Sequence, residues 1–175
     1  MGRRLFDYSA VPRPKRALIL AAMLFGSVLG YLVISRVMMQ AGIVDGESMI
    51  PTLPDGQRFI INRAVYRFRD PRVGEIVALC LPGEEDLSVK RVIALPHDLV
   101  QIKGGGVYVN GRRLAEPYLP SGAVTGGGRL GSEVHVVADN CFFVLGDNRA
   151  VSADSRAFGA VNRSWLVGRV EAGGR

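Results

Sequence analysis

Histidine and cysteine are scarce in this chain, which has only two of each among its 175 residues. His97, His135, Cys80 and Cys141 are scattered along the chain and form no cluster of metal ligands. We therefore expect no metal and no cofactor. Each cysteine lies in an apolar, strand-like run, so the spacing leaves open whether the two form a disulfide or remain free thiols.

Excess positive charge is missing from most of the chain, although the formal net charge is +6. Residues 1–16 contain five basic side chains and one acidic one, so +4 of this charge belongs to the N-terminal segment and +2 to the rest. A domain with so small a charge has no need of a polyanionic partner. We therefore expect no binding to nucleic acid.

A long uncharged run occurs once, at residues 17–35, between the basic segment and Arg36. At about 1.5 Å per residue, a helix of this length comes close to the ~30 Å thickness of a bilayer's hydrocarbon core. The alternative, a cleaved secretory signal, has an apolar core of about 7 to 15 residues. Because positive flanks stay inside, we predict a cytoplasmic segment 1–16, a single-pass anchor 17–35 in the cytoplasmic membrane, in contact with lipid, and an extracytoplasmic domain 36–175.

Long helical periodicity is absent after residue 36, and short strand-like runs separated by Pro, Gly and Asp take its place. The pair Asn110-Gly111 between strand-like flanks favours a type I′ hairpin turn. The glycine-rich stretches 104–106 and 126–128 are interpreted as flexible connections. We predict a mostly β fold, with one antiparallel β domain on a single N-terminal transmembrane helix.

Ser48 lies in the segment VDGESMIPTLPDG, soon after the predicted anchor. An isolated serine is usually a solvated loop residue, but here Gly46 permits close backbone approach and Pro51 stiffens the following turn. A serine hydroxyl is a weak nucleophile and needs a base within about 3 Å. Ser48 is therefore a candidate nucleophile if the fold brings a base to it.

Lys90 lies in the middle of the strand-like run DLSVKRVIAL. Alternation places Ser88, Lys90 and Val92 on one face of the strand. An edge-strand lysine that discourages aggregation is the ordinary interpretation. A catalytic lysine must instead be neutral, and lowering its pKa from about 10.4 to about 8 costs on the order of 3 kcal/mol, which a folded apolar core can absorb.

A third segment, FFVLGDNRAVSADSRAFG, runs from a buried strand into a dense polar turn. It is either a solvated loop or a set of side chains that orients a base. If the turn is enclosed, its members must satisfy one another through hydrogen bonds and ion pairs. These members are Asp147, Asn148, Arg149, Ser152, Asp154, Ser155 and Arg156.

Histidine is the alternative base. A Ser-His-Asp triad would need His97 or His135 beside Ser48. Neither histidine has polar neighbours in the sequence that resemble a triad. The sequence therefore favours Lys90 over histidine.

The runs ESMIPTL, KRVIALPHD and GDNRAVSADSR occur in this order and resemble the signature motifs of type I signal peptidases. The resemblance covers roughly residues 15–170, and the last motif is the most specific. It implies a serine endopeptidase that removes N-terminal signal peptides from secretory preproteins after small-x-small sites, on the β fold shared with self-cleaving repressors. It further implies that Ser48 attacks the scissile carbonyl, while Lys90 takes its proton and returns it to the leaving amine.

The same resemblance assigns supporting roles and a substrate site. It implies that Ser152 hydrogen-bonds and orients Lys90, that Asp147 pairs with Arg91, and that the backbone N–H of Ser48 donates to the oxyanion. Asp154 and Arg156 are the expected structural ion pair beneath the site. The substrate-binding residues are expected to be Val44, Met49, Leu53 and Val89 in small S1 and S3 pockets, with an extended substrate beside Asp45 and Val89.

The sequence departs from the family pattern at three positions. Gly46 stands where one branch of the family has a serine whose hydroxyl completes the oxyanion hole. Gln57 replaces an aspartate, and His97 replaces a glycine in the turn after Lys90. The short domain resembles the compact, single-anchor bacterial members.

Two other functions fit part of the sequence. Self-cleaving repressors share the serine and lysine arrangement, but they are cytoplasmic and carry a DNA-binding helix-turn-helix where this chain has its uncharged run. A non-catalytic, anchored β module that binds exported proteins would leave Ser48, Lys90 and Ser152 unexplained together.

Overall fold

The computed structural model describes residues 13–172, apart from the side chains of residues 13–16 and 32–37. Most of the predicted cytoplasmic segment 1–16 therefore lies outside the described residues. Helix α1 (Arg13–Met38) forms one compact unit, and the chain from Met39 onward forms a second. By length and mean hydropathy, none of the helices in the described part of the chain qualifies as a membrane span.

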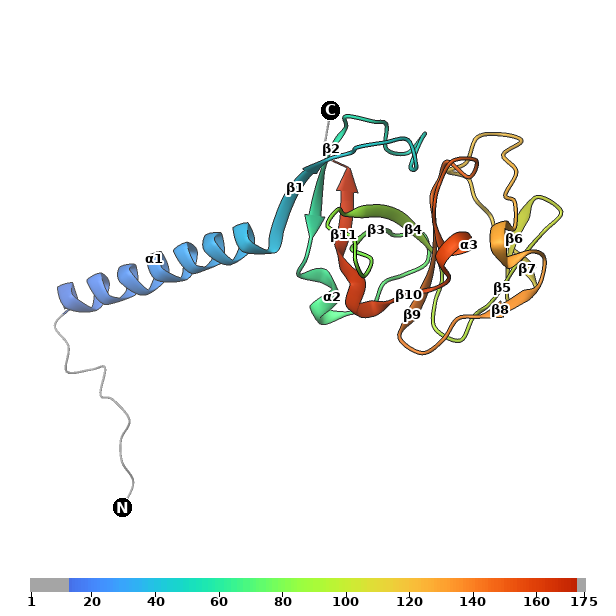
Figure 1. Ribbon diagram of the computed structural model, residues 1–175. Helices are drawn as coiled ribbons and strands as arrows, with labels where there is room; N and C mark the ends of the chain where they lie inside the picture. Colours follow the sequence, from blue (N-terminus) through green and yellow to red (C-terminus); the bar gives the residue numbers. More distant parts are fainter. Residues whose placement is uncertain (1–12, 173–175) are drawn as a thin grey trace, which may run out of the picture. The chain divides into compact units, whose positions relative to one another are not determined.

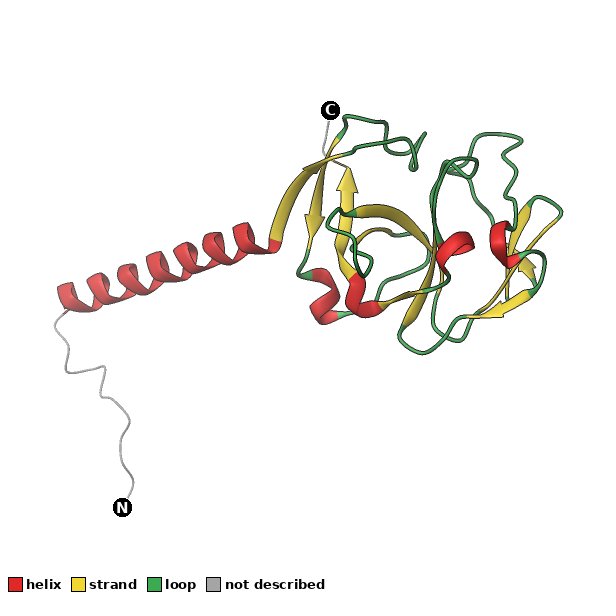
Figure 2. Ribbon diagram, viewed as in Figure 1, coloured by secondary structure: helices red, strands yellow, loops and turns green. Residues whose placement is uncertain are grey.

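The second unit is built almost wholly from antiparallel strands, with only short helices between them (Figure 1, Figure 2). Its larger sheet has seven strands in the order β1-β2-β11-β3-β4-β9-β10. These strands are β1 (Met39–Ile43), β2 (Arg58–Asn62), β3 (Ile76–Leu79), β4 (Ser88–Ala94), β9 (Cys141–Leu145), β10 (Val161–Asn162) and β11 (Leu166–Ala172). Short helices α2 (Val65–Phe68) and α3 (Ser155–Phe158) and a 3-10 turn, Arg163–Trp165, join them. The predicted mostly antiparallel β architecture is confirmed.

The smaller sheet has four strands in the order β7-β6-β5-β8, and a 3-10 turn, Gly128–Leu130, precedes its last strand. Its strands are β5 (Leu99–Lys103), β6 (Gly106–Val109), β7 (Arg112–Arg113) and β8 (Val134–Val136).

Tight turns join the first three strands of the smaller sheet. Asn110 and Gly111 have φ values of 52° and 77° between β6 and β7, as the predicted type I′ turn requires. Gly104 and Gly105, with φ values of 55° and 76°, make a second two-residue turn between β5 and β6. The interpretation of stretch 104–106 as a flexible connection is therefore wrong, because its glycines close a hairpin.

Strand β4 lies in the interior of the larger sheet, between β3 and β9. Val89 packs with the apolar group that contains Met49 and Leu53, whereas Val92 packs with Phe142 and its neighbours on the other face. The predicted alternation of faces is therefore present. An interior strand also excludes the edge-strand interpretation of Lys90, which is only 5% exposed.

Cys80 and Cys141 are both free thiols. Cys80 directly follows β3, and Cys141 begins β9. The sequence left open whether the two cysteines pair, and the structure shows that they do not form a disulfide.

Candidate active site

Ser48 is held in a loop that closes between β1 and β2. The backbone N–H of Val44 donates to the carbonyl of Gln57 at 2.9 Å, and the N–H of Gly56 donates to the carbonyl of Val44 at 2.9 Å. Met49 and Leu53 are 1% and 0% exposed and pack into the core, which stabilises the loop by about 2 kcal/mol for each side chain. The loop therefore presents the half-buried Ser48 on a fixed support.

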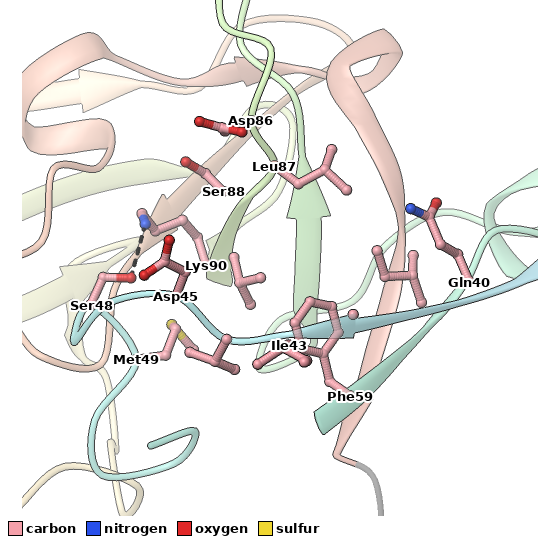
Figure 3. Close-up of a pocket in the computed structure, with 14 residues that line it drawn as sticks. Gln40, Ile43, Asp45, Ser48, Met49, Phe59, Asp86, Leu87, Ser88 and Lys90 are labelled. Atoms are coloured by element: carbon pink, nitrogen blue, oxygen red, sulfur yellow. Dashed lines mark hydrogen bonds between the residues drawn. The ribbon is translucent and has the colours of Figure 1, made fainter. Parts of the chain in front are cut away.

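The structure brings Lys90 to Ser48. The Nζ of Lys90 donates to the Oγ of Ser48 at 3.2 Å, the interaction drawn as a dashed line in Figure 3. Burial lowers the pKa of Lys90, and the negative charges of Asp154 and Glu84 oppose that shift without cancelling it. A lysine with a lowered pKa beside a serine hydroxyl can accept its proton.

Arg91, the residue after Lys90, forms a buried ion pair with Asp147. Its Nε and Nη2 lie 2.9 and 2.5 Å from the carboxylate oxygens. The hydroxyl of Thr52 donates to the same carboxylate at 2.5 Å. The Cζ of Arg91 lies over the ring of Tyr118, 3.9 Å from the ring centroid. The Ser48 loop, β4 and the Asp147 turn are joined through these contacts.

A second buried pair, Asp154 with Arg156, supports the polar turn. The Arg156 Nε donates to Asp154 at 2.8 Å, and the Asp154 carboxylate also accepts from the backbone N–H of Gly146 at 3.0 Å. Arg156 donates in addition to the carbonyls of Arg149 and Ser152, at 2.8 and 3.3 Å. This pair therefore fixes the backbone of the segment that carries Ser152.

Ser152 lies against the Ser48 loop. A Cβ placed on Gly146 would lie 2.2 Å from the Ser152 Oγ and 2.5 Å from the Ser48 carbonyl oxygen, so only glycine fits between them. The N–H of Asn148 donates to that carbonyl at 3.0 Å. The Ser152 Oγ is buried and has no hydrogen-bond partner within the described chain, so the expected bond to Lys90 is not formed in this structure.

A pocket of about 440 Å³ opens beside Ser48 and Lys90 (Figure 3). Four of the predicted substrate-binding residues line it: Val44, Asp45, Met49 and Val89. Leu53, the fifth, does not reach the pocket and is wholly buried in the core beneath it. The lining residues that sequence reasoning missed are Gln40, Gly42, Ile43, Phe59, Ile61, Asp86, Leu87 and Ser88.

Neither histidine takes part in this site. The His97 side chain is 76% exposed, and its Nδ1 lies 3.4 Å from Asp139. The Nε2 of His135 lies 3.0 Å from the carbonyl of Leu130. The geometry therefore gives no support to a Ser-His-Asp triad.

Comparison with known proteins identifies the family. Residues 16–173 match the profile of the family described as "Signal peptidase, peptidase S26". The chain belongs to this family. It is therefore a serine endopeptidase.

Signal peptidases from several bacteria are similar to the chain. It is 41% identical to signal peptidase I of Bacillus amyloliquefaciens over 132 residues, which cover 72% of this chain and 70% of that one. It is 40% identical to the probable signal peptidase I-2 of Synechocystis over 136 residues, which cover 74% of this chain and 60% of that one. A crystal structure of a signal peptidase I from Enterococcus faecalis aligns with a TM-score of 0.49 and 27% identity, over 58% of this chain and 97% of that one.

Sequence reasoning missed several supporting residues of this signal peptidase site. Thr52 and Tyr118 contact Arg91 or its partner Asp147, while Glu116 and Thr125 both accept hydrogen bonds from the guanidinium of Arg149. Thr52 could have been found because it lies four residues after Ser48. The other three lie in loops far from the motifs, where only the fold brings them near.

Replacing Asp154 by Asn is expected to lower the free energy of unfolding by about 3 kcal/mol, because it leaves the Arg156 guanidinium buried without its countercharge. Urea denaturation of the full-length protein measures this loss. Asp70→Asn is the matched control, since Asp70 is 78% exposed in its ion pair with Arg163 and is expected to cost less than about 1 kcal/mol. Equal losses in the two variants would contradict a structural role for the buried pair.

Proposed function

We propose that this protein is a membrane-anchored signal peptidase that removes N-terminal signal peptides from exported preproteins, with Ser48 as nucleophile and Lys90 as general base. The observation that carries the proposal is the 3.2 Å contact between the buried Lys90 Nζ and the Ser48 Oγ at the wall of a pocket. The family relationship supports the same activity, since the relatives described above are named signal peptidases.

The chemistry follows from this contact. Neutral Lys90 takes the hydroxyl proton of Ser48 as the Oγ bonds to the scissile carbonyl carbon, whose oxygen becomes negatively charged. The lysine ammonium then gives its proton to the leaving amine, the carbon–nitrogen bond breaks, and an ester to Ser48 remains. Water activated by Lys90 hydrolyses this ester and releases the signal peptide with a new carboxylate.

The oxyanion is stabilised by the backbone N–H of Ser48 in this proposal. That N–H makes no hydrogen bond within the described part of the chain, so it is available to a substrate oxygen. Gly46 supplies no hydroxyl, and its own N–H already donates to Asp55 at 2.9 Å. The hydroxyl contribution known from one branch of the family is therefore missing here.

Substrate binding is supported by the free edge of the larger sheet. Strand β1 pairs only with β2 in that sheet, and the pocket runs along β1 from Gln40 toward Ser48. An extended substrate can add to this edge between Asp45 and Val89, with alternate side chains directed into the pocket. Met49, Phe59 and Val89 help line that pocket, which suits small side chains at the first and third positions before the cut.

Around the dyad, we assign Ser152 to orienting Lys90 and both buried ion pairs to structural support. Ser152 carries a hydroxyl that has no partner in the described part of the chain and lies beside the Ser48 loop, so the lysine ammonium can use it during the reaction. Asp147 with Arg91, and Asp154 with Arg156, hold the elements that carry the dyad.

The activity is tested by incubating purified protein with a secretory precursor and sequencing the new N-terminus. We expect one cut after a small-x-small site. Changing the small residue just before the cut to Leu is expected to reduce kcat/KM by about 100-fold, because the larger side chain overfills the pocket. Cleavage at unrelated positions, or indifference to this change, would refute the assignment.

The membrane anchor is proposed from the sequence alone, on the uncharged run 17–35 and its basic flank. We place the N-terminus inside and the catalytic unit outside the cytoplasmic membrane. Protease added to intact spheroplasts is expected to digest the part of the chain after Met39 and to spare the N-terminal segment. Protection of the catalytic unit until the cells are lysed would contradict this topology.

A further inference from the structure

A second hollow of about 290 Å³ lies next to the candidate active site. It is lined by Gly128, Arg129, Arg149, Ala150, Ser152, Arg156 and Ala157. Ser152 connects it to the dyad, because a Cβ on Gly146 would touch both the Ser152 Oγ and the Ser48 carbonyl oxygen. The hollow is therefore separated from the Ser48 loop only by Ser152 and Gly146. Neither Ser48 nor Lys90 is part of its lining.

Three arginines line the hollow, and only Arg129 is without a partner among the residues that the structure describes. Arg149 pairs with Glu116, and Arg156 pairs with Asp154, so these two buried charges are neutralised locally. Arg129 is exposed and makes no ion pair or hydrogen bond within the described chain. The hollow therefore has a net positive charge, which Arg129 supplies.

The backbone that leads into Arg129 is held in place by packing at the glycines before it. A Cβ on Gly128, whose φ is +59°, would lie 2.9 Å from the Arg156 Cβ and 3.0 Å from the Arg156 carbonyl oxygen. The Nη1 of Arg156 also donates to the carbonyl of Gly126 at 3.5 Å. Segment 126–128 is therefore packed against α3, and its interpretation as a flexible connection is wrong.

We propose that this hollow binds the mature side of the preprotein and that Arg129 favours an acidic residue there. The proposal rests on the proposed function, since the first pocket takes the residues before the scissile bond only if Ser48 is the nucleophile. The chain after the bond must then leave on the Ser152 side, and at about 3.3 Å per residue an extended chain needs only a few residues to reach the hollow. A guanidinium at that place can bind a carboxylate through two N–H groups.

The test uses three peptides that share one signal-peptide cleavage site and carry Glu, Gln or Lys at the third position after the cut. For the parent enzyme we expect kcat/KM to fall from Glu to Gln to Lys, with about tenfold between Glu and Lys. In the Arg129→Gln variant, the ratio of kcat/KM for the Glu peptide to kcat/KM for the Lys peptide is expected to fall to about 2 or less. Arg112→Gln removes an exposed charge from β7, outside the hollow, and is expected to keep the parent ratio.

Two results would overturn the proposal: no preference for Glu in the parent enzyme, or the same preference in Arg129→Gln. The preference is also expected to weaken from low to high salt, because an exposed ion pair is screened. If the Gln peptide is cleaved at the expected bond, the proposed function stands whatever the ratio shows. If no peptide is cleaved, Arg129 can still be tested by binding. Two fluorescent peptides that carry only the sequence after the cut, one with Glu and one with Lys at the third position, are then compared, and equal affinity of the enzyme for both refutes the subsite.

Discussion

Lys90→Arg is expected to lower kcat/KM by at least about 1,000-fold, because a guanidinium cannot give up its proton to become a base. Arginine keeps the positive charge, so a purely electrostatic role for residue 90 would leave much of the rate. Cleavage of a signal-peptide substrate measures the effect. Lys103→Arg, in an exposed position on β5, is the matched control and is expected to retain parental activity.

The pH profile tests the same role without a mutation. Burial lowers the pKa of Lys90, so activity is expected to rise with pH through an apparent pKa below the ordinary lysine value of about 10.4. Below the lowered pKa the ammonium form predominates and cannot accept the Ser48 proton. A pH-independent rate would contradict the base assignment.

Folding of the Lys90 variants can be separated from catalysis. Since the folded state disfavours the lysine charge, the charge of Lys90 costs stability in full below the lowered pKa. Between the lowered and the ordinary pKa the unfolded chain binds more protons, so this cost is relieved as the pH rises. Lys90→Met is therefore expected to be inactive yet at least as resistant to urea as the parent at neutral pH. A folded Lys90→Arg enzyme that kept more than about a tenth of the parental rate, a loss of under ~1.4 kcal/mol in the barrier, would remove Lys90 from its role.

Ser48→Ala is expected to lower kcat/KM by at least about 10,000-fold, because the ester intermediate can no longer form. The change removes one oxygen from a half-buried side chain and leaves Met49 and Leu53 in the core, so the fold is expected to persist. Mass spectrometry of the incubated precursor measures residual cleavage, and circular dichroism checks the fold.

Ser121→Ala is the control for Ser48→Ala, since Ser121 lies in an exposed loop. It is expected to cleave at the parental rate. Substantial cleavage by Ser48→Ala would show that another residue is the nucleophile. Binding of precursor without cleavage by the parent enzyme would favour the non-catalytic anchored module instead.

Local chemistry in the sequence was sufficient to predict the strands and the Asn110-Gly111 turn, whereas the candidate dyad was predicted from the resemblance to type I signal peptidases. Alternation over residues 88–92 defined two faces of β4, because side chains alternate along any strand. The motifs around Ser48, Lys90 and Ser152 were visible because each gathers reactive side chains within a few residues. Sequence reasoning went wrong at the glycine stretches, since a run of glycines is equally compatible with a flexible linker, a hairpin turn or a close packing contact.

Pairings between distant residues could not be derived from local chemistry; the family resemblance implied several of them, and the tertiary structure decided them. Ser48 and Lys90 are 42 positions apart, and only the insertion of β4 between β3 and β9 buries the lysine and lowers its pKa. The sequence gives each strand's alternation but not its neighbours, so it could not tell an edge lysine from an interior one. For the same reason Leu53 was assigned to the pocket, although the fold places it in the core below, and the hollow beside Arg129 became visible only once α3 and segment 126–131 were packed together.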